Sequence, residues 1–308
     1  MNIQWYPGHM TKTRRMIVEN LKNIDAVCEI VDARIPVSSR NPDLDALAAR
    51  KPRLIILNRV DLADKDKTAM WSRYFRGHGM QVVETNSKSG IGVNKFAPAL
   101  RELLNEKLKY YNERGLVGRL IRVMICGIPN VGKSTFINRV AGRTAAKAED
   151  RPGVTRGKQW IRVDEGIDMM DTPGMLWPKF EDKLAALHLA YTGAVKDDIL
   201  DTETLAAHLM ETLVPMYPDA LTERYKIDIS GNIGGYELLR RAAEKRSLRI
   251  SGGEFDLERM ARVLLDEFRA GQLGRMTLEL PSEIDREPLL ELRLKQYDDD
   301  AMITEDLI

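Results

Sequence analysis

The stretch CGIPNVGKSTFINRV, residues 126–140, decides the fold. Its first part, GIPNVGKS at 127–134, fits the pattern G-x-x-x-x-G-K-[ST] at every fixed position. The apolar run LIRVMICG before it predicts a buried parallel strand, and Phe136, Ile137 and Val140 behind it have helical spacing. A strand, a glycine-rich loop and a helix in this order predict a nucleotide site, because loop amides and a helix N-terminus stabilise phosphate charge.

Within this loop, the residue types predict distinct roles. Lys133 is expected to reach the β- and γ-phosphates, and the Ser134 hydroxyl is expected to bind Mg²⁺. The residues expected to contact the nucleotide here are Asn130, Val131, Gly132, Lys133, Ser134 and Thr135.

Two downstream segments fit the same chemistry. DTPG follows the strand-like run IRVDEGIDMMD at 161–171, so Asp171 is expected to hold Mg²⁺ through water and the Gly174 amide to contact the γ-phosphate. In RPGVTRG, between the loop and this strand, Thr155 is a candidate second Mg²⁺ ligand in a mobile switch. The alternative for that segment is a plain basic loop.

The base-reading motif lies upstream of the phosphate loop. RLIILNRVDL at 53–62 predicts a strand that ends in Asn58, Arg59, Val60 and Asp61, which is N-K-x-D with arginine in place of lysine. An aspartate in this position accepts hydrogen bonds from N1–H and the exocyclic amine of guanine. One strand and helix later, Asn86 and Ser87 stand where main-chain amides would support the base.

The order along the chain is therefore base motif, base loop, phosphate loop, switch and DTPG. This order predicts a circularly permuted domain, which a doubly wound sheet tolerates because its strands need only be neighbours in space. We expect an α/β fold with a mostly parallel sheet, followed by a small all-helical domain with apolar residues at helical spacing. The predicted divisions are 1–178 for the GTPase domain, 179–285 for the helical domain and 286–308 for an acidic extension.

Composition narrows the class of protein. The 308 residues are 44% hydrophobic and carry a net charge of +1, without an apolar run long enough to span a membrane or a signal-peptide core at the start. Cys28 and Cys126 lie in apolar runs and are expected to be buried free thiols. Residues 139–162 carry seven basic and two acidic side chains, which form either a solvated face or, beside a nucleotide loop, a surface for an anionic partner. We expect a monomeric cytoplasmic protein that binds neither membranes nor DNA.

The chain resembles bacterial circularly permuted GTPases that act in ribosome biogenesis. The likeness rests on WYPGHM, VDARIPVSSRNP, LNRVDL, GIPNVGKST, DRPGVT, DTPGMLWPKFED and KRSLRISGG, which together span most of the length. It implies GTP hydrolysis to GDP and phosphate, coupled to a late step in assembly of the large (50S) ribosomal subunit. The implied partners are GTP or GDP and the rRNA and proteins of the subunit precursor. The departures are Arg59 and the acidic extension.

Many GTPases carry a glutamine after D-x-x-G that orients the attacking water, and here that position is Met175. A thioether cannot do this, so either the chain hydrolyses GTP slowly or another group completes the site when the ribosomal particle binds. The resemblance carries a functional histidine at the position of His9, in WYPGHMTKTRR. The alternative is that His9 caps the following helix or packs locally.

Two further residue groups have open assignments. Asn130 stands where potassium-using GTPases carry asparagine, so its side chain either helps to bind K⁺ or holds the loop shape. A basic cluster in the helical domain either binds rRNA or is a solvated helix face; its members are Arg240, Arg241, Lys245, Arg246 and Arg249. The rival functions are an RNA-processing enzyme with an accessory GTP domain and a nucleotide-gated scaffold that barely hydrolyses GTP.

Overall fold

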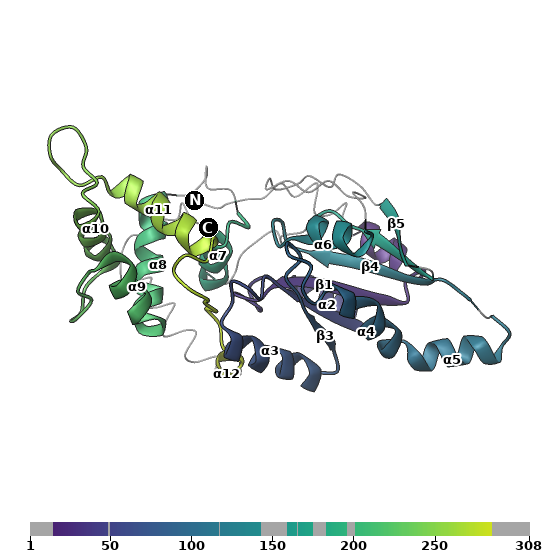
Figure 1. Ribbon diagram of the computed structural model, residues 1–308. Coiled ribbons are helices and arrows are strands. Elements are labelled where there is room, and N and C mark those ends of the chain that lie inside the picture. Colours follow the sequence, from purple (N-terminus) through teal and green to yellow (C-terminus); the bar gives the residue numbers. More distant parts are fainter. Residues whose placement is uncertain are drawn as a thin grey trace.

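A computed structural model describes residues 15–48, 50–116, 118–142, 159–164, 166–174, 183–195 and 201–284. At its centre lies a six-stranded sheet in the order β3-β2-β1-β4-β6-β5 (Figure 1). The strands are β1 (Ala26–Asp32), β2 (Arg53–Asn58), β3 (Gln81–Glu84), β4 (Ile121–Gly127), β5 (Gln159–Asp164) and β6 (Ile167–Asp171). All neighbouring pairs are parallel except β5 with β6. The predicted doubly wound, mostly parallel sheet is confirmed.

The strand-like run at 161–171 contains parts of two strands, of which the apolar residues 167–170 lie in β6. Gly166 has a φ of 104°, a left-handed conformation that glycine adopts without strain, and the chain reverses there. β6 therefore returns along β5, and β5 forms the antiparallel edge of the sheet.

One face of the sheet is covered by α3 (Lys65–Gly77), α2 (Pro42–Leu47) and the helical residues 15–21. Trp71 and Phe75 of α3 pack with Leu57 and other side chains that project from this face. Burial of this aromatic pair is worth several kcal/mol, since each large apolar side chain contributes about 1.5–3 kcal/mol.

The other face is covered by α4 (Phe96–Leu103) and α6 (Lys133–Val140), with the short 3-10 helix η1 (Val93–Lys95) beside them. The Phe96 and Phe136 rings meet edge to face with centroids 5.3 Å apart. α5 (Asn105–Glu113) extends beyond the sheet and buries none of its side chains (Figure 1). Cys28 and Cys126 are buried free thiols, as predicted, and burial raises the pKa of both.

The later part of the chain is helical. Its helices are α7 (Lys183–Tyr191), α8 (Thr202–Met216), α9 (Pro218–Tyr225), α10 (Gly235–Lys245), α11 (Leu257–Arg269) and α12 (Pro281–Ile284). Asp256 caps α11 by accepting a hydrogen bond from the Arg259 amide at 2.9 Å. α9 begins at Pro218, because proline is tolerated at the first position of a helix, where its missing N–H would have no partner in any case. None of the helices in the described ranges is long and apolar enough to cross a membrane.

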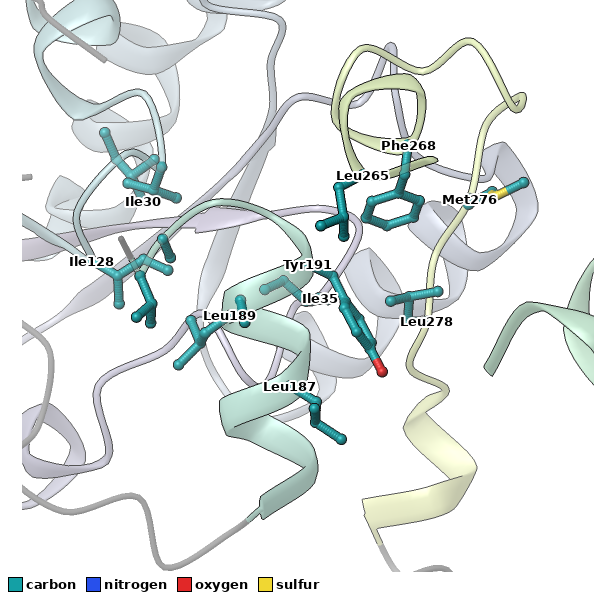
Figure 2. Packing of buried hydrophobic residues seen from close by; sticks show 14 of the residues in the cluster. Ile30, Ile35, Ile128, Leu187, Leu189, Tyr191, Leu265, Phe268, Met276 and Leu278 are labelled. Carbon is teal, nitrogen blue, oxygen red and sulfur yellow. The ribbon is translucent and has the colours of Figure 1, made fainter. Parts of the chain in front are cut away.

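The helical part returns to the sheet and shares its hydrophobic core. Tyr191, Phe268, Met276 and Leu278 lie together with Ile35, which follows β1 (Figure 2). The hydrophobic cluster is therefore continuous from the sheet into the helical part.

Backbone hydrogen bonds fix the segment that makes this return. The Met276 amide donates to the Leu62 carbonyl at 2.9 Å, and the Leu278 amide donates to the Arg34 carbonyl at 2.8 Å. The Trp71 indole N–H donates to the Glu279 carbonyl at 3.0 Å. The end of the helical part is thus attached to the loops that follow β1 and β2.

A buried ion pair organises the loop after β1. Arg34 Nη2 lies 2.8 Å from Asp32 Oδ2, and the two side chains are 1% and 3% exposed. The guanidinium also lies over the Phe268 ring of α11, 5.4 Å from its centroid. Burial raises the pKa of Asp32, but the charges of Arg34 and Arg59 and the hydrogen bonds from Arg34 outweigh it, so the pKa is below its usual value.

We predict that Arg34→Met lowers the free energy of unfolding by about 3–5 kcal/mol, because it leaves the buried Asp32 carboxylate without its main partner. Urea denaturation measures the change, with Arg162→Met as the control because Arg162 is 54% exposed in its ion pair. The control should change stability by less than about 1 kcal/mol. A native Asp32 with a lowered pKa stabilises the fold above the unfolded pKa and loses this effect in acid. The gap between native and variant should therefore narrow as the pH falls towards and below 3.8. Equal stability of the two variants would contradict the account.

Candidate functional site

The candidate site lies along the carboxyl edge of the sheet, where the order reverses between β1 and β4. The loops after β1, β2, β3, β4 and β6 all meet at this edge, because these five strands are parallel. In open α/β sheets this is the position at which ligands bind.

The loop between β4 and α6 has the backbone that a phosphate-binding loop requires. Gly132 has a φ of 96°, and a Cβ there would lie 2.4 Å from Asn58 Nδ2. A Cβ on Gly127 would lie 2.9 Å from the Ile30 carbonyl oxygen, which leaves no room for a side chain. Both glycines are therefore needed for the loop to take this path against its neighbours. α6 begins at Lys133, so its free amides and its dipole face the loop.

Lys133 and Asp171 form a buried ion pair across the loop. Lys133 Nζ contacts Asp171 Oδ1, and the two side chains are 7% and 1% exposed. Asp171 ends β6, beside the β4 strand that leads into the loop. The parallel pairing of these two strands is what brings residues 38 positions apart into contact.

The residues at this position fit Mg²⁺. Ser134 supplies a hydroxyl oxygen in the first turn of α6, and Asp171 supplies a carboxylate, both of which are hard oxygen donors that Mg²⁺ prefers. In the described ranges no cluster of three or more His, Cys, Asp or Glu side chains could hold a metal.

The DTPG segment lies directly against the phosphate loop. A Cβ on Gly174 would be 3.2 Å from Pro129 Cα, which is a tight contact, so a side chain here would push the two backbones apart by a few tenths of an ångström. Thr172, which the sequence reasoning did not single out, donates from its hydroxyl to the Ile125 carbonyl at 2.8 Å and ties the segment to β4. A change in the conformation of the phosphate loop would therefore displace the backbone at Gly174.

Asn58 joins three loops of the site. Its Nδ2 donates to the Val131 carbonyl at 2.8 Å, within the phosphate loop. Its Oδ1 accepts from the Ser87 amide at 3.0 Å and from the Ser87 hydroxyl at 2.7 Å. The Thr85 hydroxyl donates to the same oxygen at 3.2 Å. The two halves of the site, separated along the chain, are thus held together by one buried carboxamide.

The other residues of the base motif differ in their surroundings: Arg59 contacts the phosphate loop, whereas Asp61 is exposed. Arg59 has a φ of 61°, and its guanidinium donates to the Asn130 carbonyl and lies 3.5 Å from Asp32 Oδ2. Asp61 is exposed, so its carboxylate can accept hydrogen bonds from a base. The Val60 amide donates to the Thr85 carbonyl at 3.3 Å, which links this loop to the one after β3.

The loop after β3 is held by its own turn and by α6. Asn86 Oδ1 accepts from the Lys88 and Ser89 amides, each at 3.0 Å. Arg139 of α6 donates to the Ser87 carbonyl at 3.4 Å and to the Lys88 carbonyl. Sequence reasoning missed Arg139, since nothing in its neighbourhood marks a side chain that reaches another loop.

The remaining residues predicted in the phosphate loop have different surroundings. Val131 is buried, whereas Ser134 and Thr135 are half-buried. Asn130 has a φ of 57°, and its Nδ2 donates to the Gly193 carbonyl at 2.8 Å. The structure thus brings together, at one edge of the sheet, the predicted residues from 58 to 61, 86 to 87, 130 to 135, 171 and 174.

The basic cluster of the helical part lies elsewhere and is partly engaged in ion pairs. Arg240 and Arg241 both pair with Glu237, at 2.7 and 2.9 Å. Arg246 pairs at 2.9 Å with the largely buried Glu267. These ion pairs give Arg240, Arg241 and Arg246 a structural role within the helical part. The other two members, Lys245 and Arg249, are exposed. His9, Thr155 and Met175 lie outside the described residues.

Comparison with known proteins agrees with this geometry. A family model described as 50S ribosome-binding GTPase matches residues 122–223. The chain is 45% identical over 284 residues to ribosome biogenesis GTPase A of Bacillus cereus, which covers 92% of this chain and 95% of the relative. It is 31% identical over 282 residues to ribosome biogenesis GTPase A of Thermotoga maritima, covering 92% and 96%.

Among solved structures, GDP-bound TM YlqF superposes with a TM-score of 0.64 at 28% identity, covering 87% of this chain and all of that one. GNP-bound YlqF from T. maritima gives a TM-score of 0.60 at 28% identity, covering 88% and 98%. Three observations have one explanation: the nucleotide motifs are separated along the chain, they meet at one edge of the sheet, and the similarity to these relatives extends over almost the whole chain. The chain belongs to the ribosome biogenesis GTPase A family and is a GTP hydrolase built on a circularly permuted P-loop GTPase domain.

Proposed function

We propose that this GTPase uses its nucleotide state to control a late step in assembly of the large ribosomal subunit in the cytoplasm. Its relatives are named for ribosome biogenesis, and the matching family model is described as 50S ribosome-binding. In this proposal the GTP-bound form binds rRNA and proteins of the 50S precursor, and the GDP-bound form leaves. The observation that carries it is the packing of Gly174 on Pro129, which makes the DTPG segment sensitive to the occupied phosphate loop.

A GTPase domain works with Mg²⁺, which neutralises charge on the transferring phosphoryl group. We assign Ser134 as a direct ligand, Thr155 of the switch as the second ligand, and Asp171 as a residue that holds the ion through water. Lys133 would leave its partner Asp171 for the β- and γ-phosphates when nucleotide binds. When nucleotide and metal bind, the buried Lys133–Asp171 ion pair would thereby be replaced by pairs of Lys133 with the phosphates and of Asp171 with Mg²⁺.

For base selection we assign Asp61, supported by main-chain amides of the Asn86–Ser87 loop. Asn58 acts indirectly by holding this loop against the phosphate loop. Arg59, whose guanidinium contacts the Asn130 carbonyl, has a role in holding the phosphate loop that its position in the motif does not reveal.

Asp61→Asn should lower affinity for GTP by roughly tenfold or more, since a charge-assisted hydrogen bond is worth about 1.5–3 kcal/mol. Affinity for xanthine nucleotides should rise, because the amide offers a donor where xanthine has a carbonyl. Titration with GTP, XTP and ATP measures the change. Asp66→Asn, at an exposed position of α3, is the matched control and should bind like the native chain. Equal affinity of the native chain for ATP and GTP would refute the assignment.

Met175 leaves the attacking water without the usual glutamine, and we propose that His9 supplies this function when the ribosomal particle binds. His9→Ala should lower particle-stimulated hydrolysis by roughly 10²–10⁴-fold, the usual effect of a positioned proton-transfer group. GTP binding should not change. His78→Ala is the control, since His78 is exposed and bonds only locally to the Tyr74 carbonyl. Native turnover of the His9 variant on the particle would show that this histidine is structural.

We also propose that Asn130 contributes to a K⁺ site beside the phosphates, where a monovalent cation would stabilise negative charge. Hydrolysis should then be faster in KCl than in NaCl at equal ionic strength. Asn130→Ala should remove most of the difference. Identical rates of the native chain in the two salts would exclude the ion from the mechanism.

The helical part, from about residue 179 to 285, is proposed to carry the rRNA contacts through Arg240, Arg241, Lys245, Arg246 and Arg249. Lys245 and Arg249 are exposed, and the side chains of Arg240 and Arg241 are 43% and 32% exposed in their ion pairs. Binding of such a surface to RNA displaces counterions and should weaken steeply with salt.

The combined change of Arg240, Arg241 and Lys245 to Glu should abolish co-sedimentation with large subunits while GTP affinity stays native. The matched control reverses the same number of charges on α3, at the exposed residues Lys65, Arg73 and Arg76. Native chain should sediment with the particle in the GTP state and less in the GDP state. Equal sedimentation in both states would refute the switch, and a control as defective as the test variant would refute the assigned surface.

A further inference from the structure

The turn after α7 connects the helical part of the chain to the phosphate loop. Asn130 Nδ2 donates to the Gly193 carbonyl at 2.8 Å, although 63 positions separate the two residues. A carbonyl oxygen can only accept, so the nitrogen of the carboxamide must face Gly193. Because the carboxamide is planar, this contact also fixes the direction of Asn130 Oδ1.

The position of the Gly193 carbonyl is set by the way in which α7 ends. The Gly193 amide donates to the Ala190 carbonyl at 3.1 Å, and the Ala194 amide donates to the Leu189 carbonyl at 2.9 Å. With a Gly193 φ of 74°, this is the left-handed glycine termination common at helix ends. The acceptor for Asn130 is therefore part of a defined turn.

A side chain from α11 holds this turn. Arg269, the last residue of α11, donates from Nε to the Tyr191 carbonyl at 3.0 Å and from Nη2 to the Ala190 carbonyl at 2.9 Å. These carbonyls belong to the last turn of α7, where a cation is also favoured by the helix dipole. A Cβ on Gly193 would lie 3.4 Å from Arg269 Nε, so guanidinium and turn are in direct contact.

We propose that Arg269 is a positioning residue for GTP hydrolysis, which acts through the Gly193 turn to fix the side chain of Asn130. The inference rests on the proposed role of Asn130 beside the phosphates, and it extends that site to a residue of the helical part. The planar guanidinium of Arg269 donates to two carbonyls at once, and a lysine cannot reproduce this geometry. Movement of α11 on a partner would thereby be transmitted through the Gly193 turn to the phosphate loop.

The test is a double-mutant cycle with Arg269→Ala and Asn130→Ala, measured as kcat and KM for GTP in KCl. Arg269→Ala should lower kcat by about fivefold or more, the equivalent of one hydrogen bond, with little change in KM. In the Asn130→Ala background the same change should have no further effect on kcat. Arg269→Lys, which keeps the cation at the end of α7, should recover part of the loss and guards against a variant that fails to fold. Arg262→Ala is the matched control, since Arg262 lies on α11, is 66% exposed and pairs with Glu258.

Additive effects of the two substitutions would overturn the inference, because Arg269 would then act on stability alone. A native kcat for Arg269→Ala, together with a reduced kcat for Asn130→Ala, would overturn the inference and leave the proposed role of Asn130 intact. A native kcat for Asn130→Ala would overturn both. Equal binding of the native chain to large subunits in the GTP and GDP states would contradict the proposed function and leave the role of Arg269 intact.

Discussion

The buried carboxamide of Asn58 is the interaction on which the site depends. It donates to the phosphate loop at Val131 and accepts from the base loop at Ser87, so two segments from opposite halves of the permuted domain share one anchor. A carboxamide offers both a donor and an acceptor, which lets a single side chain satisfy both loops. Leaving either partner unpaired in this buried position would cost about 1–3 kcal/mol.

The sheet explains why this arrangement survives permutation of the chain. Parallel strands place all their carboxyl ends at one edge, whatever the order in which the chain visits them. The consequence is that the helical part, which follows the DTPG segment, comes to lie against the loops after β1 and β2. Leu278 bonds to Arg34 and Met276 to Leu62, so the end of the helical part is attached beside the base motif.

Much of the fold and the core of the site could be predicted from the sequence, because the apolar runs and the motifs at their ends are local signals. The contacts between distant segments could not. Arg59 resembles a base-motif lysine, yet its bond to the Asn130 carbonyl depends on the pairing of β1 with β2 and β4. Arg139 and Arg269 likewise act on segments far away in sequence. The hairpin at Gly166 was missed because the strand-like residues on both sides of it were read as one segment, and the pairing of β5 with β6 is not visible in a local pattern.

The central claim is that the separated motifs form one guanine-nucleotide site through Asn58. Its most direct test is the affinity of Asn58→Ala for GTP by titration, with Asn86→Ala, which loses only local turn bonds, as the comparison. The account predicts a loss of roughly a hundredfold for Asn58→Ala, since several hydrogen bonds of about 1 kcal/mol each are removed together. It predicts a smaller loss for Asn86→Ala. Native affinity of the Asn58 variant would contradict the account.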